Sequence, residues 1–176
     1  MKNKENKMRD IRIEKITLNI GTGQPGDKLD KAVILLQTIA QQKPIKTKTM
    51  KRIPTWGLRP RLEIGCKVTI RGKKAELLLS RLLDAIDHSL AFRNFDNKGN
   101  LSFGIPEYID IPNTQYNPQI GIIGLEAAIT FQRKGYRISK RRYKKIRIPI
   151  SHQITQEDSI NFLKNKFQVR LKEDDH

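Results

Sequence analysis

Residues 62–71 alternate strictly, with apolar side chains at the even positions and polar or small ones at the odd positions. A β-strand with this period has one buried face and one solvated face. Parallel strands that are buried on both faces have continuous runs of apolar residues instead of this alternation. The segment therefore predicts a mostly antiparallel sheet with one face left open to water or to a polar partner.

Other segments continue this pattern. Residues 11–20 and 122–131 are predicted as strands, because their apolar residues also recur at every second position. A short strand is expected at residues 45–49, and residues 101–111 are expected to be extended with interruptions at a glycine and a proline.

Helical periodicity predicts two main helices, over residues 27–40 with Asp27 as N-cap and over residues 74–91. A third helix is expected after Thr155, where Thr155 and Asp158 resemble a capping box with Asp in place of Glu. This order of strands and helices gives an α+β fold, a mostly antiparallel sheet with both main helices covering its apolar face.

The chain divides into three predicted parts. Residues 1–10 form a basic N-terminal arm, residues 11–132 form the α+β domain, and residues 133–176 form a basic C-terminal extension with the last helix. Within the domain, residues 50–61 join two strands by a loop far longer than a hairpin turn, and such loops are usually functional or disordered. Its cations and single tryptophan predict a projecting finger that contacts RNA, the alternative being a mobile surface loop.

The charge of the chain points to a polyanionic partner. Lys and Arg total 35 against 18 Asp and Glu, a formal net charge of +17, and self-repulsion of that size is relieved by a polyanion. Residues 1–74 carry +13 and residues 133–176 carry +8, whereas residues 75–132 carry −4. In the segment 133–147, nine of fifteen residues are basic and none is acidic, which is typical of segments that bind polyanions or stay disordered until they do. Its basic residues are Arg133, Lys134, Arg137, Lys140, Arg141, Arg142, Lys144, Lys145 and Arg147.

The residue inventory argues against several classes of protein. Cys66 is the single cysteine, so an internal disulfide framework and a multi-cysteine zinc site are excluded. No apolar run of about 18 residues exists, so a spanning helix is not expected. The three histidines and the acids form no catalytic constellation. We therefore expect a non-enzymatic protein with no cofactor, no metal and no small-molecule substrate.

Residues 21–26 fit the G-x-G-x-x-G pattern between a predicted strand and a predicted helix, as in a dinucleotide site. Three features oppose that alternative. Pro25 removes a backbone N–H from the loop, lysines occupy the region where the ribose-binding acid belongs, and the next long strand has a polar face. A nucleotide-dependent enzyme is the rival hypothesis, and a membrane-surface protein using the basic segment 133–147 is the third.

The polar face of the predicted sheet interleaves short hydrogen-bonding groups with cations. Its members are Lys15, Thr17, Asn19, Lys67, Thr69 and Arg71. This pattern suits a rigid, flat surface for RNA, the alternative being an ordinary solvated face. Aromatic residues make up only 6% of the chain, which favours structured RNA over single strands, because single-strand binding needs several stacking platforms.

Five motifs in order carry a family resemblance over about residues 8–170. They are Glu14–Gly23, Gln42–Pro44, Ile64–Gly72, Asn94–Ile105 and Tyr116–Gly124. The sequence resembles the universal ribosomal protein family numbered five in the bacterial and archaeal large subunit and eleven in eukaryotes. The resemblance implies binding of 5S rRNA through the polar face of the sheet. It also implies anchoring to 23S-type rRNA in the central protuberance, beside the other 5S-binding ribosomal protein.

The resemblance also assigns residues. An asparagine, a glutamine and a threonine that contact 5S rRNA in the family match Asn19, Gln42 and Thr69. We expect the 5S rRNA interface to include neighbouring residues as well: Thr17, Lys67, Arg71, Lys46 and Lys48. The family's long loop reaches toward P-site tRNA and matches the finger residues Lys51, Arg52, Trp56, Gly57, Arg59 and Arg61.

The ends of the chain depart from the bacterial members of the family. The bacterial N-terminal helix is missing, and the basic segment and last helix exceed the bacterial form, so residues 54–57, 116–118 and the tail indicate the archaeal type. The docking of the tail on large-subunit rRNA is inferred from charge. A cytoplasmic ribosomal protein, with no membrane partner, is the expected identity.

Overall fold

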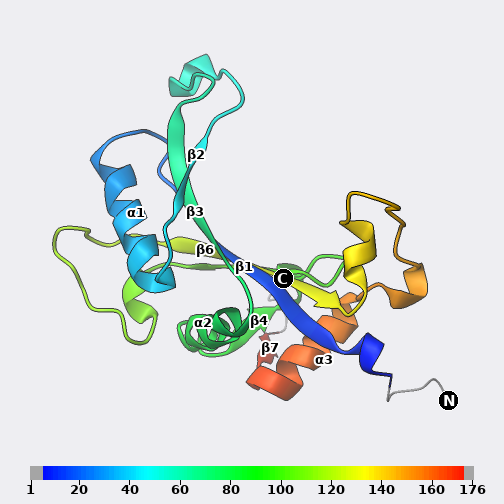
Figure 1. Ribbon diagram of the computed structural model, residues 1–176. Helices are drawn as coiled ribbons and strands as arrows, with labels where there is room; N and C mark the ends of the chain where they lie inside the picture. Colours follow the sequence, from blue (N-terminus) through cyan, green and yellow to red (C-terminus); the bar gives the residue numbers. More distant parts are fainter. Residues whose placement is uncertain (1–5, 173–176) are drawn as a thin grey trace.

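The computed structural model describes residues 6–172 and contains one five-stranded sheet (Figure 1). The strand order is β2-β3-β1-β6-β5, and all neighbouring pairs are antiparallel. The strands are β1 Ile11–Gly21, β2 Ile45–Lys48, β3 Glu63–Ile70, β5 Leu101–Ile105 and β6 Leu125–Arg133. The predicted α+β fold with an antiparallel sheet is confirmed.

Two helices, α1 (Asp27–Ala40) and α2 (Lys73–Asp84), lie on the same side of this sheet (Figure 1). Their buried leucines pack on the strands, with Leu36 and Leu79 fully buried against a sheet layer that includes Ile16 and Leu18. The opposite side of β1 and β3 carries the polar residues of the alternating pattern, none of which is buried. The predicted separation into a covered apolar face and an open polar face is therefore confirmed.

The helix boundaries differ from the prediction at two points. Gly26 is the N-cap of α1 and Asp27 is its first residue, where the carboxylate still lies favourably in the first turn. The second helix ends at Asp84 rather than at residue 91, because Asp87 and His88 adopt left-handed backbone conformations that cannot continue a helix.

The chain after α2 forms a small second sheet that the sequence analysis missed. Strand β4 (Ser89–Ala91) pairs in parallel with β7 (Arg170–Lys172), near the C-terminal end of the described chain. His88 fixes this junction, with its Nδ1 2.9 Å from the Phe167 carbonyl oxygen and its Nε2 2.8 Å from Asp84 Oδ1. The pair ties the region after α2 to the end of the last helix.

The basic extension is folded onto one end of the sheet. It leads to α3 (Gln156–Phe167), and the predicted capping box between Thr155 and Asp158 is confirmed. The α3 N-terminus packs on the loop before β5, where a Cβ added at Gly99 would lie 2.7 Å from the Thr155 carbonyl oxygen. Gly99 also has a φ of +71°, so both space and backbone conformation require glycine there.

Short 3₁₀ turns join the main elements. They are Lys7–Arg9, Pro54–Trp56, Phe92–Asn94, Tyr108–Asp110, Tyr136–Ser139 and Ile150–His152. The first lies in the predicted N-terminal arm and is capped by Asn6, while residues 1–5 of that arm lie outside the described residues. The second forms the tip of the finger.

The finger and the basic extension lie at opposite ends of β1. Gly21, at one end of the strand, pairs with Gly65 of β3 beside the finger, and Ile11, at the other end, pairs with Arg133 where the extension begins. Figure 1 shows the finger projecting from the sheet beyond the rest of the fold. Since β1 has 11 residues, the strand itself is about 33 Å long.

Candidate nucleic-acid interface

Paired residues of neighbouring strands arrange the open side of the sheet in rows, and we call this surface the polar face. The middle row is uncharged and has only small side chains: Thr69, Thr17, Ala128 and Ser102. The next row toward the finger is more polar: Lys67, Asn19, Glu126 and Gly104. Small side chains in a central row leave the backbone accessible, so a rigid partner can approach the sheet closely.

The structure brings Asn19, Thr17, Thr69 and Lys67 together on the polar face, as the alternation predicted. The Asn19 amide nitrogen donates a hydrogen bond of 3.1 Å to Glu126 Oε2. This bond orients the amide, and the amide oxygen of Asn19 accepts no hydrogen bond from the described residues. Glu126 is a residue of this face that the sequence analysis missed, although the alternation of 122–131 placed it opposite the apolar positions.

Lys46 was predicted to bind 5S rRNA, but it does not lie on the polar face. It pairs in the sheet with buried Cys66, so its side chain projects to the helix side, where its Nζ lies 2.8 Å from Asp30 Oδ1. That hydrogen bond raises the pKa of Lys46 above its usual value. Lys48 lies at a register shift of β2 and pairs with Glu63 at 3.6 Å. Gln42 is half-buried in the turn between α1 and β2.

The finger presents cations that nothing in the described chain neutralises. Its hairpin is closed by hydrogen bonds from the Leu58 N–H to the Ile53 carbonyl and back, and Trp56 at the tip is 70% exposed. The residues predicted to contact tRNA are all exposed: Lys51, Arg52, Trp56, Gly57, Arg59 and Arg61. Because these cations have no carboxylate partner within residues 6–172, they remain available to an external anion.

Arg133 differs from the other cations of the extension. Its side chain is 9% exposed, and its guanidinium donates to Asp158 Oδ2 at 2.8 Å and to the Gln153 carbonyl at 3.1 Å. It joins the end of β6 to the start of α3, and these internal partners occupy the guanidinium that was predicted to contact rRNA. The sequence could not distinguish this arginine from its neighbours, because only the docking of α3 buries it.

The remaining cations of the segment 133–147 fall into two groups. Lys134 pairs with Asp10, and Lys140 pairs with Glu14. The others have no carboxylate partner in the described part of the chain and are exposed: Arg137, Arg141, Arg142, Lys144, Lys145 and Arg147. The second group makes the extension a strongly positive surface beside the polar face.

Glu14 holds the extension against the sheet. Its side chain is 10% exposed and contacts Lys140 of the extension and Arg71, which lies 3.5 Å away. Burial alone would raise the pKa of Glu14, but the hydrogen bond from Lys140 and the charges of Lys140, Lys15 and Arg71 outweigh it and hold the pKa below the ordinary 4.5. The carboxylate is therefore ionised at neutral pH. It forms an ion pair with Arg71, one of the residues predicted to bind RNA.

Replacing Glu14 with Gln should destabilise the fold by about 1 kcal/mol at neutral pH, since the partners are surface cations. A carboxyl with a lowered pKa stabilises the folded state above its unfolded pKa of about 4.5 and loses that contribution as pH falls through the folded value. The difference between wild type and variant in urea unfolding should therefore shrink below pH 4.5. A difference that grows on acidification would contradict this role.

The glycine-rich turn does not form a phosphate cradle. The backbone N–H groups of Thr22 and Gly23 both donate to the Ile64 carbonyl oxygen, at 2.9 and 3.0 Å. The start of the turn therefore continues the pairing of β1 with β3, and these two amides are not available to a phosphate. Burial raises the pKa of the Cys66 thiol to about 11, so it is not a nucleophile at neutral pH. Within residues 6–172, no helix is long and apolar enough to cross a bilayer, and no group of His, Cys, Asp and Glu could hold a metal ion.

Two family models together match almost the whole chain. The model described as Ribosomal protein L5 matches residues 6–59, and a second model, which describes the C-terminus of the same ribosomal family, matches residues 63–171. The chain belongs to the ribosomal protein L5 family. This family is structural and non-enzymatic, so the alternative of a nucleotide-dependent enzyme is wrong.

The chain is also similar to curated archaeal members of the L5 family. The protein named Large ribosomal subunit protein uL5 of Nanoarchaeum equitans is 46% identical over 168 residues, covering 95% of this chain and 99% of its own length. Its namesake in Sulfurisphaera tokodaii is 46% identical over 169 residues, with 96% of each chain covered. The one in Methanobrevibacter smithii is 42% identical over 164 residues, with 93% and 96% covered. The predicted archaeal type is confirmed.

Proposed function

We propose that this L5-family protein binds 5S rRNA on its polar face and joins it to the large-subunit rRNA through the basic extension. At the coarser level, the protein is a structural constituent of the large ribosomal subunit in the cytoplasm of an archaeon. The finer assignment rests on the resemblance and on the geometry of the polar face. The other 5S-binding ribosomal protein is the proposed neighbour in the central protuberance.

The observation that carries the proposal is the uncovered polar face with cations at both ends. Both main helices pack on the other side, so the sheet surface between the finger and the extension lies open. Its central row offers the hydroxyls of Thr17 and Thr69, which can bond to 2′-hydroxyls and phosphate oxygens. A-form RNA presents such groups across its wide, shallow minor groove, which suits a flat surface.

Binding to 5S rRNA should weaken strongly with salt, because cations condensed on the phosphates are released on binding. If about six phosphates are neutralised, the affinity should fall roughly 10³-fold between 50 and 200 mM salt. Filter binding with purified protein and transcribed 5S rRNA measures this slope, with a tRNA of similar charge density as competitor. A competitor that displaces 5S rRNA at equal concentration would show that the binding is electrostatic only and would contradict the proposal.

The finger is proposed to contact P-site tRNA rather than 5S rRNA. The Thr49 N–H donates to the Leu62 carbonyl and the Arg61 N–H donates to the Thr49 carbonyl, so the hairpin base is closed without the tip. Replacing residues 51–60 by an Asn-Gly turn should keep 5S rRNA affinity within about 3-fold and reduce P-site tRNA retention on ribosomes about 10-fold. Loss of 5S rRNA binding in this variant would show that the finger contacts 5S rRNA and would contradict the proposal.

The control for the finger variant should remove charge elsewhere. Lys73 and Lys74, in the first turn of α2 on the helix side of the sheet, are exposed. Changing both to Ala lowers the net charge without altering the finger. Equal loss of tRNA retention in this control would show that net charge alone is responsible.

A further inference from the structure

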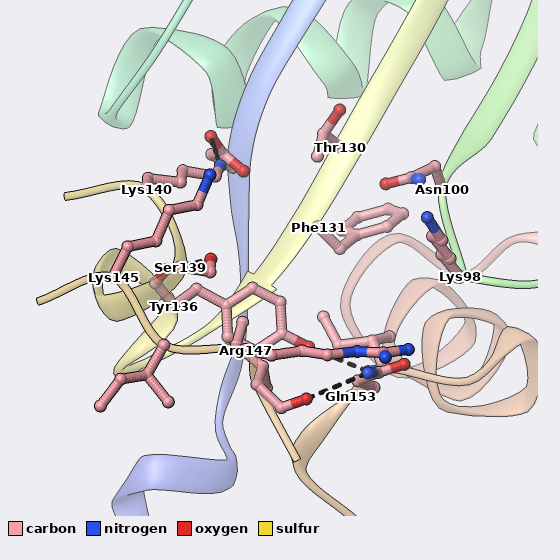
Figure 2. A pocket seen from close by; sticks show the side chains of 14 residues that line it. Lys98, Asn100, Thr130, Phe131, Tyr136, Ser139, Lys140, Lys145, Arg147 and Gln153 are labelled. Atoms are coloured by element: carbon pink, nitrogen blue, oxygen red, sulfur yellow. Dashed lines mark hydrogen bonds and ion pairs between the residues drawn. The ribbon is translucent and has the colours of Figure 1, made fainter. Parts of the chain in front are cut away.

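A cavity of about 690 Å³ lies where the extension meets the end of the polar face (Figure 2). Its walls come from Glu14 of β1, Thr130 and Phe131 of β6, the loop before β5 and the extension itself. A volume of this size is typical of sites that hold a small ligand or one unit of a polymer. The folding of the extension onto the sheet creates it.

The walls of this cavity are positive on two sides. Figure 2 shows Lys140 and Lys145 on one side and Lys98 on the other, with Arg147 below. Lys140 forms an ion pair with Glu14, but Lys98, Lys145 and Arg147 have no carboxylate partner among the described residues. A guanidinium and ammonium groups converging on one space favour a phosphate group.

The floor of the cavity is aromatic. The ring of Tyr136, which is half-buried, lies between the two groups of cations (Figure 2), whereas the Phe131 ring beside it is 3% exposed and packs on Phe162 of α3. The Tyr136 hydroxyl donates to the His152 carbonyl at 3.1 Å and accepts from the Ile154 N–H at 3.0 Å, so its ring is held in place. A fixed aromatic surface beside cations is the arrangement on which a nucleic-acid base stacks.

Two polar groups at the rim have no bonding partner within the described chain. They are the Thr130 hydroxyl and the side-chain oxygen of Asn100, whose amide nitrogen is already bonded to Asp96 at 2.8 Å. One donor and one acceptor at the edge of an aromatic floor can bond to the polar edge of a base. Phosphate-binding cations, a stacking floor and edge-bonding groups together define a site for a nucleotide.

We infer that this cavity takes one unstacked nucleotide of an RNA strand, with its base on the Tyr136 ring and its phosphate between Lys98, Lys145 and Arg147. The inference rests on the proposed function and deepens it. Thr130 lies one row from Thr17 and Ala128 on the same side of the sheet, so a strand leaving the polar face reaches the cavity directly. The occupant is therefore part of the bound RNA and not a free nucleotide.

The test is ultraviolet cross-linking of native large subunits followed by mass spectrometry of the protein. The expected result is a nucleotide adduct within residues 130–147, in addition to adducts on peptides of β1 and β3. Adducts on β1 and β3 with none in residues 130–147 would overturn the inference and leave the proposed function intact. Absence of the β1 and β3 adducts would count against the proposed function itself.

A binding measurement with matched variants gives a second, independent test. The probe is a fluorescein-labelled hexaribonucleotide bound to full-length protein. Changing Lys145 and Arg147 to Ala should weaken it at least 10-fold more than changing Arg141 and Arg142 to Ala, because the second pair lies in the same segment and does not line the cavity. Equal weakening by both pairs would overturn the inference. Displacement of the probe by free adenosine monophosphate at equal concentration would overturn the assignment to an RNA strand.

Discussion

Changing Asn19 and Thr69 together to Ala should lower the affinity for 5S rRNA about 100-fold, the largest effect expected from uncharged substitutions. Each side chain is proposed to make a hydrogen bond to RNA that becomes buried on binding, and losing such a bond costs about 1–3 kcal/mol. A combined loss of about 2.8 kcal/mol corresponds to 100-fold. Filter binding at fixed salt measures the change.

The matched control uses the same residue types on the helices. Thr38 of α1 and Asn161 of α3 are exposed, and changing both to Ala should leave 5S rRNA affinity within about 2-fold. Urea unfolding of both double variants shows whether the fold is retained. An equal loss of affinity in the two double variants would contradict the assignment of the polar face.

Changing Arg133 to Met should destabilise the protein by about 1–3 kcal/mol, because removing this buried side chain leaves the groups that it bonds without their partner. The Gln153 carbonyl and Asp158 would lose their bonds to the guanidinium, while Asp158 would keep its bond from the Thr155 N–H. The docking of α3 on the sheet should weaken first. Urea unfolding and amide hydrogen exchange of α3 measure the effect.

Arg137 provides the control for this prediction, because it is an exposed arginine of the same segment. Changing Arg137 to Met should alter the free energy of unfolding by less than about 0.5 kcal/mol. A double-mutant cycle of Arg133→Met with Asp158→Asn isolates the coupling between the two side chains. A coupling near zero would show that Arg133 is a surface cation, as the sequence suggested.

The sequence predicts the central sheet well because each of its main strands has one buried face and one solvent-exposed face. Period-two alternation is then visible in β1, β3 and β6, and it identifies Thr17, Asn19 and Thr69 as outward-facing. The capping box at α3 is equally local, since Thr155 and Asp158 satisfy each other's backbone within one turn. Features of this kind depend only on neighbouring residues.

The misplaced features depend on contacts between distant segments. The sequence does not show on which side of the sheet Lys46 lies, and the register of β2 against β3 turns it to the helix side. The pairing of β4 with β7 joins two three-residue segments about 80 positions apart, which no local pattern indicates. The cavity residues Lys98 and Asn100 were also missed as site residues, although the motif Asn94–Ile105 contains them.

A structure of the archaeal large subunit containing this protein tests the central claim most directly. The account predicts RNA within hydrogen-bonding distance of Thr17 and Thr69, with α1 and α2 turned away from that RNA. A subunit in which the polar face is exposed to solvent, or in which 5S rRNA packs on the α1 and α2 side, would contradict it.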